Sequence, residues 1–401
     1  MRVNGESVMV SPRVSVGRDW SAMKIDNVAD SLKVGCRNDT EWGEKEENSG
    51  GALYSLTVNS VPSLPPQQKL VVGYALTSKK IKSFLRPTLE GLARFGLGWL
   101  VMWILTIQRV MWCRKKGIVF VAIDQSRSLL DQGPFDIVLH KISGKEWCQV
   151  LEEYQLKHPE VTVLDPPDAI KQLHNRQSML KDVADLNLCS SSGKIGVPKQ
   201  LVVEGDPNSI PDAVNRAGLK LPLVAKPLLV DGTARSHELS LAYDQFSLSK
   251  LQPPLVLQEF VNHGGVLFKV FIIGETIKVV RRFSLPDVKK SERLHNVGVI
   301  QFPRVSCAAA SAHDADLDPY VAEFPPLPLL EKLAQELRLR LGLQLFNIDI
   351  IREHGSRNSF YVIDINYFPG FGKMPDYEQI FTEFFLSLRQ GKSKKSLLGY
   401  G

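Results

Sequence analysis

Cysteine is scarce in this chain and follows no recognisable pattern. The 401 residues contain five, spaced far apart: Cys36, Cys113, Cys148, Cys189 and Cys307. The lack of a CxxC pair or zinc spacing argues against a disulfide scaffold and a zinc module. Isolated thiols are typical of reducing compartments. The first twenty residues contain scattered charges and no apolar run of signal-peptide length. We therefore expect a cytoplasmic protein, with a nuclear location also open.

Several common phosphate-transfer motifs are also missing. The chain contains no Walker A loop, and it lacks the HRD and DFG motifs of protein kinases. No Cys or His nucleophile stands in a recognisable setting, and we find no internal repeat. The net charge of +6 favours a polyanionic partner, but charge alone does not separate a small polyanion from nucleic acid.

The length predicts two or three packed lobes. Residues 1–66 are acidic overall, lack an apolar period and end in a Pro-rich run, so we expect a disordered tail. We place the remaining boundaries by changes in pattern: an N-terminal α/β lobe at 67–166, a central lobe at 167–260, a C-terminal lobe at 261–392 and a tail at 393–401.

Apolar runs alternate with helical patterns in the N-terminal lobe, which predicts a parallel sheet. We expect strands at 70–76, 117–124, 135–140 and 161–164, and helices at 79–94 and 146–158. Further along, strands are expected at 197–203, 221–226 and 255–261, with a helix at 210–217. A hairpin is expected at 266–283, followed by a helix at 327–341 and strands at 344–352 and 359–366.

Two apolar strands near the C-terminus each contain a carboxylate, Asp349 and Asp364. Side chains alternate along a strand, so Asp364 and Asn366 share a face, and Asp349 joins them if the strands pair. Two carboxylates and an amide oxygen suit Mg²⁺ held jointly with nucleotide phosphates. The alternative is a pair of buried aspartates that accept only backbone hydrogen bonds.

Two lysines interrupt apolar strands and need an anion or a route to solvent: Lys226 and Lys269. The small polar loop at 231–238 follows Lys226, and its N–H groups are candidates for phosphate binding. The strand at 255–261 runs out through Gln258 and Glu259, as an adenine-binding linker would, although an ordinary strand would look the same.

Together these motifs resemble the plant inositol-tetrakisphosphate 1-kinases, also called inositol 1,3,4-trisphosphate 5/6-kinases, from Lys69 to about Gln390. The resemblance lies in dense motifs: Ser78-Lys79-Lys80-Ile81, Asn175-Arg176-Gln177, Ala225-Lys226-Pro227, Ser236-His237-Glu238, Gln258 through Lys269, Arg282-Phe283-Ser284, Asn347-Ile348-Asp349, and Val362 through Gly370.

The resemblance implies an ATP-grasp fold of α+β lobes with an N-terminal α/β substrate lobe. It also implies that Mg²⁺ is bound by Asp349, Asp364 and Asn366. The implied ATP-binding residues are Arg176, Lys226, Gln258, Glu259, Phe260, Val261, Lys269 and Ser284. Inositol phosphate would meet Lys80, His237, Lys269 and Asn366. We expect catalysis to depend on Lys226, Lys269 and Asp364.

The expected activity is transfer of the ATP γ-phosphate to an inositol tris- or tetrakisphosphate hydroxyl, with inositol hexakisphosphate as a further possible substrate. We expect a monomer that binds no nucleic acid and does not insert stably into a membrane. One alternative is an ATP-grasp carboxylate–amine ligase, which the positions of Lys79, Lys80 and His237 argue against. A second is a non-catalytic isoform inactivated by an insertion at 95–114.

That apolar segment is absent from the family pattern, in which the helix ending near Arg94 leads almost directly to Lys115. Residues 95–107 contain Thr106 as their only polar side chain, so a surface helix there would have no polar face. The run is too short to span a bilayer. We expect that deleting residues 95–114 will raise solubility or the melting temperature without reducing kinase activity. A deletion variant that melts earlier or loses activity would show that the segment is part of the lobe.

Overall fold

The computed structural model describes residues 69–84, 116–186, 188–230, 235–289, 297–302, 319–371 and 374–398. The chain divides into two units, Met1–Ser63 and Leu64–Gly401, and every described residue belongs to the second. The predicted tail at 1–66 and the apolar segment at 95–114 lie outside the described residues. Within the described residues, no helix is long and apolar enough to cross a membrane.

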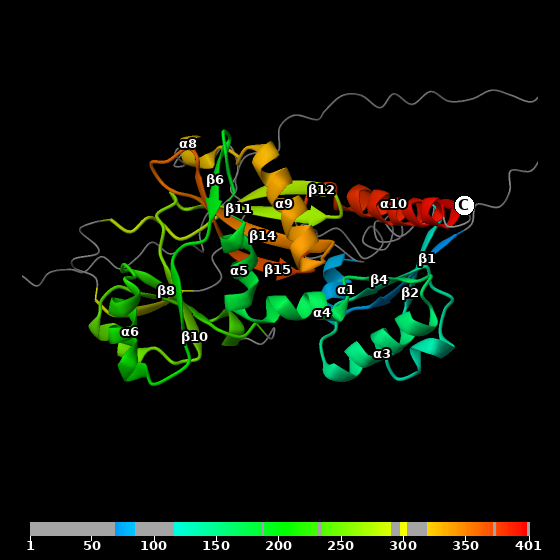
Figure 1. Ribbon diagram of the computed structural model, residues 1–401, viewed down its shortest axis with the longest axis horizontal. Helices are drawn as coiled ribbons and strands as arrows, with labels where there is room; N and C mark the ends of the chain where they lie inside the picture. Colours follow the sequence, from blue (N-terminus) through cyan, green and yellow to red (C-terminus); the bar gives the residue numbers. More distant parts are fainter. Residues whose placement is uncertain are drawn as a thin grey trace, which may run out of the picture. The chain divides into compact units, whose positions relative to one another are not determined.

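The N-terminal lobe contains the predicted parallel sheet, in the order β2-β1-β3-β4. Its strands are β1 (Leu70–Ala75), β2 (Ile118–Ala122), β3 (Ile137–His140) and β4 (Thr162–Leu164). Helix α3 (Lys145–Lys157) buries Leu151 and Tyr154 against this sheet (Figure 1). The short helix α1 (Ser78–Phe84) follows β1, and the rest of the helix expected at 79–94 lies outside the described residues.

A second sheet has the order β13-β9-β8-β10-β7, and all its pairs are antiparallel. Its strands are β7 (Gln200–Val203), β8 (Leu223–Pro227), β9 (Leu239–Ala242), β10 (Leu255–Glu259) and β13 (Val299–Phe302). Helix α6 (Ile210–Ala217) has the bounds that the sequence predicts, and it buries Ile210 and Val214 against the sheet. Strands β9 and β13 were not expected.

The third sheet has the order β12-β11-β14-β15-β6-β5. Its strands are β5 (Cys189–Ser190), β6 (Gly193–Gly196), β11 (Val266–Ile273), β12 (Thr276–Phe283), β14 (Leu345–Arg352) and β15 (Ser359–Tyr367). The predicted hairpin is confirmed residue by residue. Gly274 sits in its turn at φ +56°, where a Cβ would collide with the Phe384 ring.

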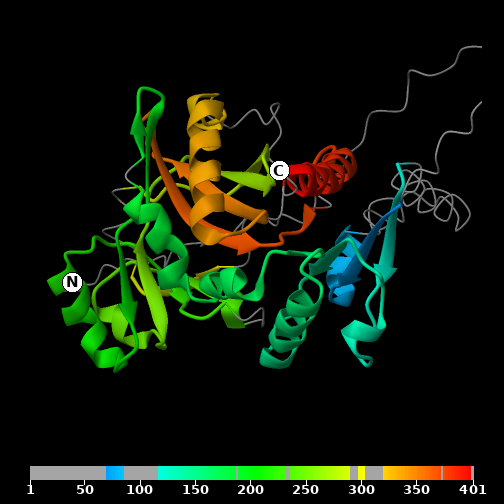
Figure 2. The same ribbon diagram turned by 45° about the vertical axis from the view of Figure 1, so that its right-hand side comes forward.

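Helices α5 (Arg176–Asp185) and α9 (Leu327–Leu341) pack with this third sheet through buried leucines, methionine and valine (Figures 1 and 2). Helix α9 has its predicted bounds, whereas α5 was not expected. Helix α10 (Tyr377–Leu398) continues past residue 392, where we place the end of the C-terminal lobe. Its aromatic residues Phe381 and Phe385 meet Phe84 and Phe120 of the N-terminal lobe.

Strand β15 contains a bulge at the position that matters most for the site. Asp349 pairs with Asp364, but the next pair along β14 is Ile350 with Val362, so Ile363 is the extra residue. A bulge releases a backbone group from the ladder and re-aims its neighbours, and such irregularities are common beside active sites. Here the Ile363 carbonyl accepts a hydrogen bond from Lys226 of the second sheet.

Candidate active site

Two acidic and two amide side chains form a row across β14 and β15. Asp349 lies opposite Asp364, and Asn347 lies opposite Asn366, so all four belong to one face of the sheet. This confirms the predicted pairing of the two carboxylate strands. Asn347 was not expected at the site, although its place two residues before Asp349 was a sufficient signal.

Hydrogen bonds tie the two carboxylates to fixed donors. Lys269 Nζ lies 2.5 Å from Asp349 Oδ1, and the Asn347 amide donates to the same oxygen at 2.6 Å. The Asn366 amide donates to Asp364 Oδ2 at 3.1 Å. Burial raises the pKa of Asp349, and the Lys269 charge acts in the opposite direction. The Asp349 carboxylate is therefore the anion that Lys269 needs at its position in an apolar strand.

Arg176 connects four elements around Asp364. Its guanidinium donates to Asp364 Oδ1 at 3.0 Å, to the Pro227 carbonyl at 3.0 Å and to the Ser236 carbonyl at 3.1 Å. The Asn175 side chain caps α5 and so fixes where Arg176 begins the helix. The Arg176 side chain is 8% exposed and that of Asp364 is 25% exposed, so the ion pair is partly shielded from water. Arg176 therefore holds Asp364 in position.

Lys226 is buried but has no direct carboxylate partner in the part of the chain described here. Its Nζ donates to Gln258 Oε1 at 2.7 Å and to the Ile363 carbonyl at 2.9 Å. Burial lowers its pKa to about 8, while Asp364 acts to raise it. Its two hydrogen-bond acceptors are neutral, and the carboxylates that favour its charge lie beyond direct contact, which suits a lysine that receives an anionic ligand.

Backbone hydrogen bonds to neighbouring segments fix the end of β10 and the residue after it. The Glu259 N–H donates to the Lys199 carbonyl at 2.9 Å, and the Phe260 N–H donates to the Pro222 carbonyl at 3.1 Å. The Glu259 carboxylate accepts from the Lys220 N–H. The N–H groups of Glu259 and Phe260 are both engaged. Val261 therefore carries the next N–H along the linker, residues 255–261.

Two lysines of the N-terminal lobe reach the end of β15. Lys80 Nζ donates to the Phe368 carbonyl and Lys141 Nζ to the Tyr367 carbonyl, each at 2.6 Å. They follow β1 and β3, which are neighbours in the parallel sheet. Ligands of open α/β sheets bind at the carboxyl ends of strands, so Lys141, the first residue after β3, was a signal that sequence reasoning missed.

These two ammonium groups have unusually low proton affinity. Burial, with a contribution from Lys79, lowers the pKa of Lys80 to about 8. Burial, with a contribution from Lys80, lowers the pKa of Lys141 to about 7. Buried cations close enough for Lys80 to lower the pKa of Lys141 indicate a site that is completed by a polyanion.

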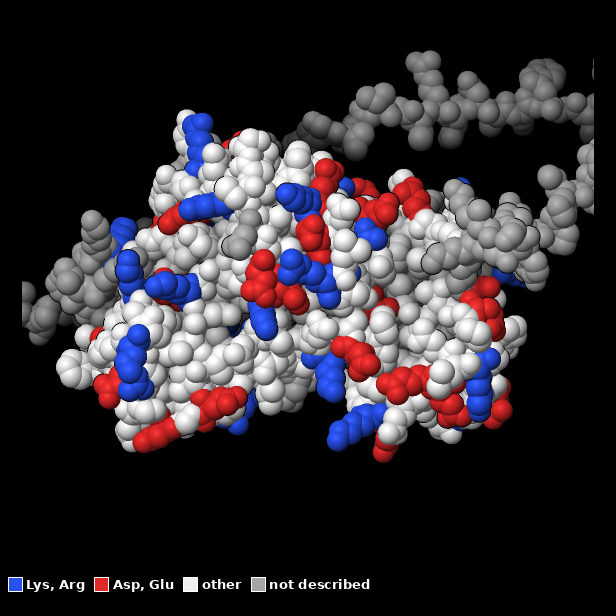
Figure 3. Space-filling view, viewed as in Figure 1, with Lys and Arg blue, Asp and Glu red and all other residues white. Residues whose placement is uncertain are grey.

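The remaining predicted residues lie on elements around this row. His237 ends the short helix η5 (Arg235–His237), whose Ser236 carbonyl accepts from Arg176. Ser284 follows β12, and its hydroxyl lies 2.7 Å from His263 Nε2. Acidic and basic side chains are interspersed on the face seen in Figure 3, so the overall positive charge does not form one patch there. The evidence for the site is therefore the set of buried hydrogen bonds and ion pairs described above, and not the surface charge.

Comparison with known proteins identifies the family of this chain. The family model described as the inositol 1,3,4-trisphosphate 5/6-kinase ATP-grasp domain matches residues 189–387. The model of its pre-ATP-grasp domain matches residues 71–101 and 104–170. This chain belongs to the inositol 1,3,4-trisphosphate 5/6-kinase family. The predicted ATP-grasp fold and the resemblance to this family are confirmed.

Relatives in this family are similar over nearly their full length. Inositol-tetrakisphosphate 1-kinase 3 of Glycine max is 63% identical over 94% of this chain and 99% of its own length. Inositol-tetrakisphosphate 1-kinase 3 of Arabidopsis thaliana is 63% identical over 90% of this chain and 96% of its own length. Inositol-tetrakisphosphate 1-kinase 2 of Oryza sativa subsp. indica is 66% identical over 83% of this chain and 90% of its own length. Membership of this kinase family weighs against the ligase alternative.

Proposed function

We propose that this protein transfers the γ-phosphate of ATP to a free hydroxyl of an inositol tris- or tetrakisphosphate. One observation carries the proposal. Lys269 contacts Asp349 of the acidic row, and Lys226 contacts the β15 backbone beside Asp364. Lys80 and Lys141 contact backbone carbonyls at the end of β15, the strand that contains Asp364 and Asn366. A metal–nucleotide site and a polyanion site therefore share one strand.

The acidic row fits Mg²⁺ by the chemistry of its donors. It offers two carboxylates and the Asn366 amide, which are hard oxygen ligands. Asn347 Oδ1 is buried and has no hydrogen-bond partner among the described residues, so the row also contains an unsatisfied acceptor. We assign Asp349, Asp364 and Asn366 as the residues that would bind the metal. When bound, Mg²⁺ would neutralise charge on the nucleotide phosphates.

The chain's own residues would act mainly by positioning and by charge. Lys226 and Lys269 would accept negative charge from the phosphates, while Arg176 keeps Asp364 in place. Lys80, Lys141 and His237 would hold phosphates of the inositol ring. These cations bring together two polyanions that otherwise repel one another. The hydroxyl then attacks the γ-phosphorus and loses its proton to solvent, the bond from the γ-phosphorus to the bridging oxygen breaks, and ADP leaves.

The adenine ring of ATP would bind at the linker formed by residues 255–261. The N–H groups of Glu259 and Phe260 are engaged, so Val261 would offer the N–H that meets the adenine ring. Gln258 would keep Lys226 beside the phosphates.

The test is ADP release by the purified full chain, with ATP and Mg²⁺, across a panel of acceptors. We expect turnover with inositol tris- and tetrakisphosphates and none with amino acids. Turnover with an amino acid acceptor would establish the ligase alternative. Absence of turnover with every acceptor, in a folded chain that binds ATP, would establish the non-catalytic isoform.

The low pKa values of Lys80 and Lys141 predict a pH dependence. An ammonium binds phosphate and a neutral amine does not, so raising the pH through about 7 and then about 8 removes charge from the substrate site. We expect the KM for inositol phosphate to rise about tenfold between pH 7 and pH 8.5. Steady-state kinetics over this range will measure it.

Lys141→Arg is the matched control for this effect, because a guanidinium keeps its charge throughout the range. The variant should lose the rise that begins near pH 7. If wild type and Lys141→Arg give the same KM profile, the assignment of Lys141 to the substrate is wrong.

A further inference from the structure

Buried hydrogen bonds join the N-terminal lobe to the ends of β14 and β15, next to the acidic row. Asp165 directly follows β4 and is 2% exposed. Its Oδ1 accepts from the Gln344 N–H at 2.5 Å, and its Oδ2 accepts from the Leu345 N–H at 3.0 Å. The Tyr367 hydroxyl, at the end of β15, donates to the His140 carbonyl at 2.7 Å. Both sets of contacts therefore run from one lobe to the other.

His140 connects these two sets of contacts within the N-terminal lobe. Its Nε2 lies 2.9 Å from the Asp165 carbonyl oxygen. A carbonyl oxygen only accepts, so Nε2 carries the hydrogen of this bond. Asp165 has a left-handed backbone with φ +62°, which is uncommon outside glycine. The His140 side chain thus holds Asp165 in place, while its own carbonyl receives the Tyr367 hydroxyl.

Lys141, the residue after His140, meets the same strand end. Its Nζ donates to the Tyr367 carbonyl and lies 4.5 Å from the centre of the Tyr367 ring. Tyr367 therefore contacts the segment after β3 through its hydroxyl, its ring and its carbonyl. Next along the chain, the Phe368 N–H donates to the Leu345 carbonyl, so the strand end that holds Lys141 is bonded to the one that Asp165 binds.

The Asp165 carboxylate is arranged for these backbone donors and for no cation among the described residues. Burial raises its pKa to about 7, and the hydrogen bonds from Gln344 and Leu345 act in the opposite direction. An asparagine would turn its own N–H₂ group toward one of the two N–H groups. Asp165→Asn therefore removes one contact between the lobes and opposes two donors, with little change in volume.

We propose that Asp165, His140 and Tyr367 form an interlobe clasp. The clasp places Lys141 beside the acidic row before inositol phosphate binds. A substrate that must meet Lys141 and Asn366 together binds only molecules in which the two lobes are aligned, and its apparent affinity falls with the aligned fraction. The three residues are positioning residues that act through the lysine. This inference rests on the proposed function and adds to it the contacts that align its two halves.

The split between KM and kcat tests the clasp. Tyr367→Phe keeps the ring and the carbonyl and loses one neutral hydrogen bond, so the KM for inositol phosphate should rise roughly 3- to 10-fold. Asp165→Asn should raise it at least about tenfold, because hydrogen bonds to a charged group are stronger. Saturating inositol phosphate restores the alignment, so kcat and the KM for ATP should stay within about twofold of wild type.

Two variants are matched controls for the chemical changes. Tyr361→Phe removes a hydroxyl from the same strand, β15, but its partner Glu353 belongs to the same lobe. Asp136→Asn alters a carboxylate that accepts from the Val71 N–H within the N-terminal lobe. Neither should change the KM for inositol phosphate.

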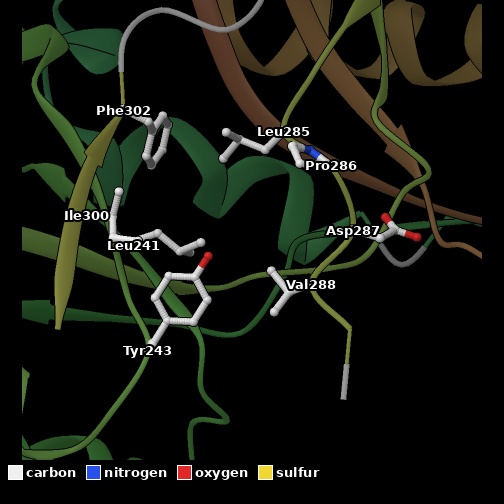
Figure 4. A pocket seen from close by; sticks show the side chains of 8 residues that line it. All are labelled: Leu241, Tyr243, Leu285, Pro286, Asp287, Val288, Ile300 and Phe302. Carbon is white, nitrogen blue, oxygen red and sulfur yellow. The ribbon is translucent and has the colours of Figure 1, made fainter. Parts of the chain in front are cut away.

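A third control separates positioning from a loss of stability. Leu241 is buried and lines an apolar cavity of about 120 Å³. Figure 4 shows the Asp287 carboxylate pointing away from the apolar side chains of this cavity. Leu241→Ala should lower the melting temperature by loss of packing. A smaller folded fraction lowers the measured rate but leaves the KM for inositol phosphate unchanged.

Unchanged KM values for inositol phosphate in folded Tyr367→Phe and Asp165→Asn would overturn the inference. A lower kcat at unchanged KM would do the same, since that is the effect expected of Leu241→Ala. Tyr367→Phe decides the outcome alone if Asp165→Asn does not fold. Calorimetric titration with an inositol tetrakisphosphate gives the same comparison without turnover. Failure of the proposed function would look different: wild type would phosphorylate no inositol phosphate, while the clasp variants would still bind this probe more weakly than wild type.

Discussion

Asp364→Asn and Asp349→Asn should each reduce turnover at least about a hundredfold while the protein stays folded. Both carboxylates lie in one register position of β14 and β15, and each accepts a hydrogen bond from a cation. An amide nearly preserves the volume but removes the charge that a divalent cation needs. The rate should be measured at saturating ATP and inositol phosphate over a range of Mg²⁺ concentrations.

The control for this prediction is Asp376→Asn. Asp376 is largely exposed and pairs with Lys278 on the surface, where an ion pair contributes little. Its rate should match wild type. Thermal melting of all three variants separates a lost metal ligand from a lost fold. Near-normal turnover by folded Asp364→Asn would disprove the metal assignment.

Replacing both Lys80 and Lys141 by alanine should raise the KM for inositol phosphate at least about a hundredfold, with a much smaller change in the KM for ATP. Each lysine would supply one charge-assisted contact to phosphate, and each such contact contributes roughly 1.5–3 kcal/mol. Both are on the N-terminal lobe, whereas the nucleotide linker follows β10. The two KM values should be measured separately under saturation by the other substrate.

Lys157→Ala controls for the loss of a surface charge from the same lobe, since Lys157 pairs only with Glu153 within α3 in the described structure. It should leave both constants unchanged. A rise confined to the ATP constant in the double variant would place these lysines in the nucleotide site. Equal rises in both constants would indicate damage to the lobe.

Much of the fold was predictable because its longest elements are amphipathic or fully buried. The hairpin β11–β12 and helix α9 have the expected bounds, since a buried apolar run and a helical period leave little choice of register. The missed elements depend on distant partners. Strand β6 pairs with β15 across more than 160 residues, and β13 joins β9 only through the tertiary fold.

The acidic row was predictable for a similar reason. Strand alternation places Asp364 with Asn366, and pairing adds Asp349. The bulge at Ile363 was not predictable, because no residue of the strand marks it and its released carbonyl bonds Lys226 of another sheet. Lys141 was missed because its strand ends in a different lobe from the row, and only the packed structure brings its Nζ to Tyr367.

The destination of the γ-phosphate tests the central claim most directly. The full chain should be incubated with Mg²⁺, γ-labelled ATP and an inositol tetrakisphosphate, and the products separated by charge. Our account predicts that the label moves into an inositol pentakisphosphate in step with ADP formation, and that chelation of the metal stops the transfer. Label found only in free phosphate or remaining in ATP, with folded protein that binds both substrates, would contradict it.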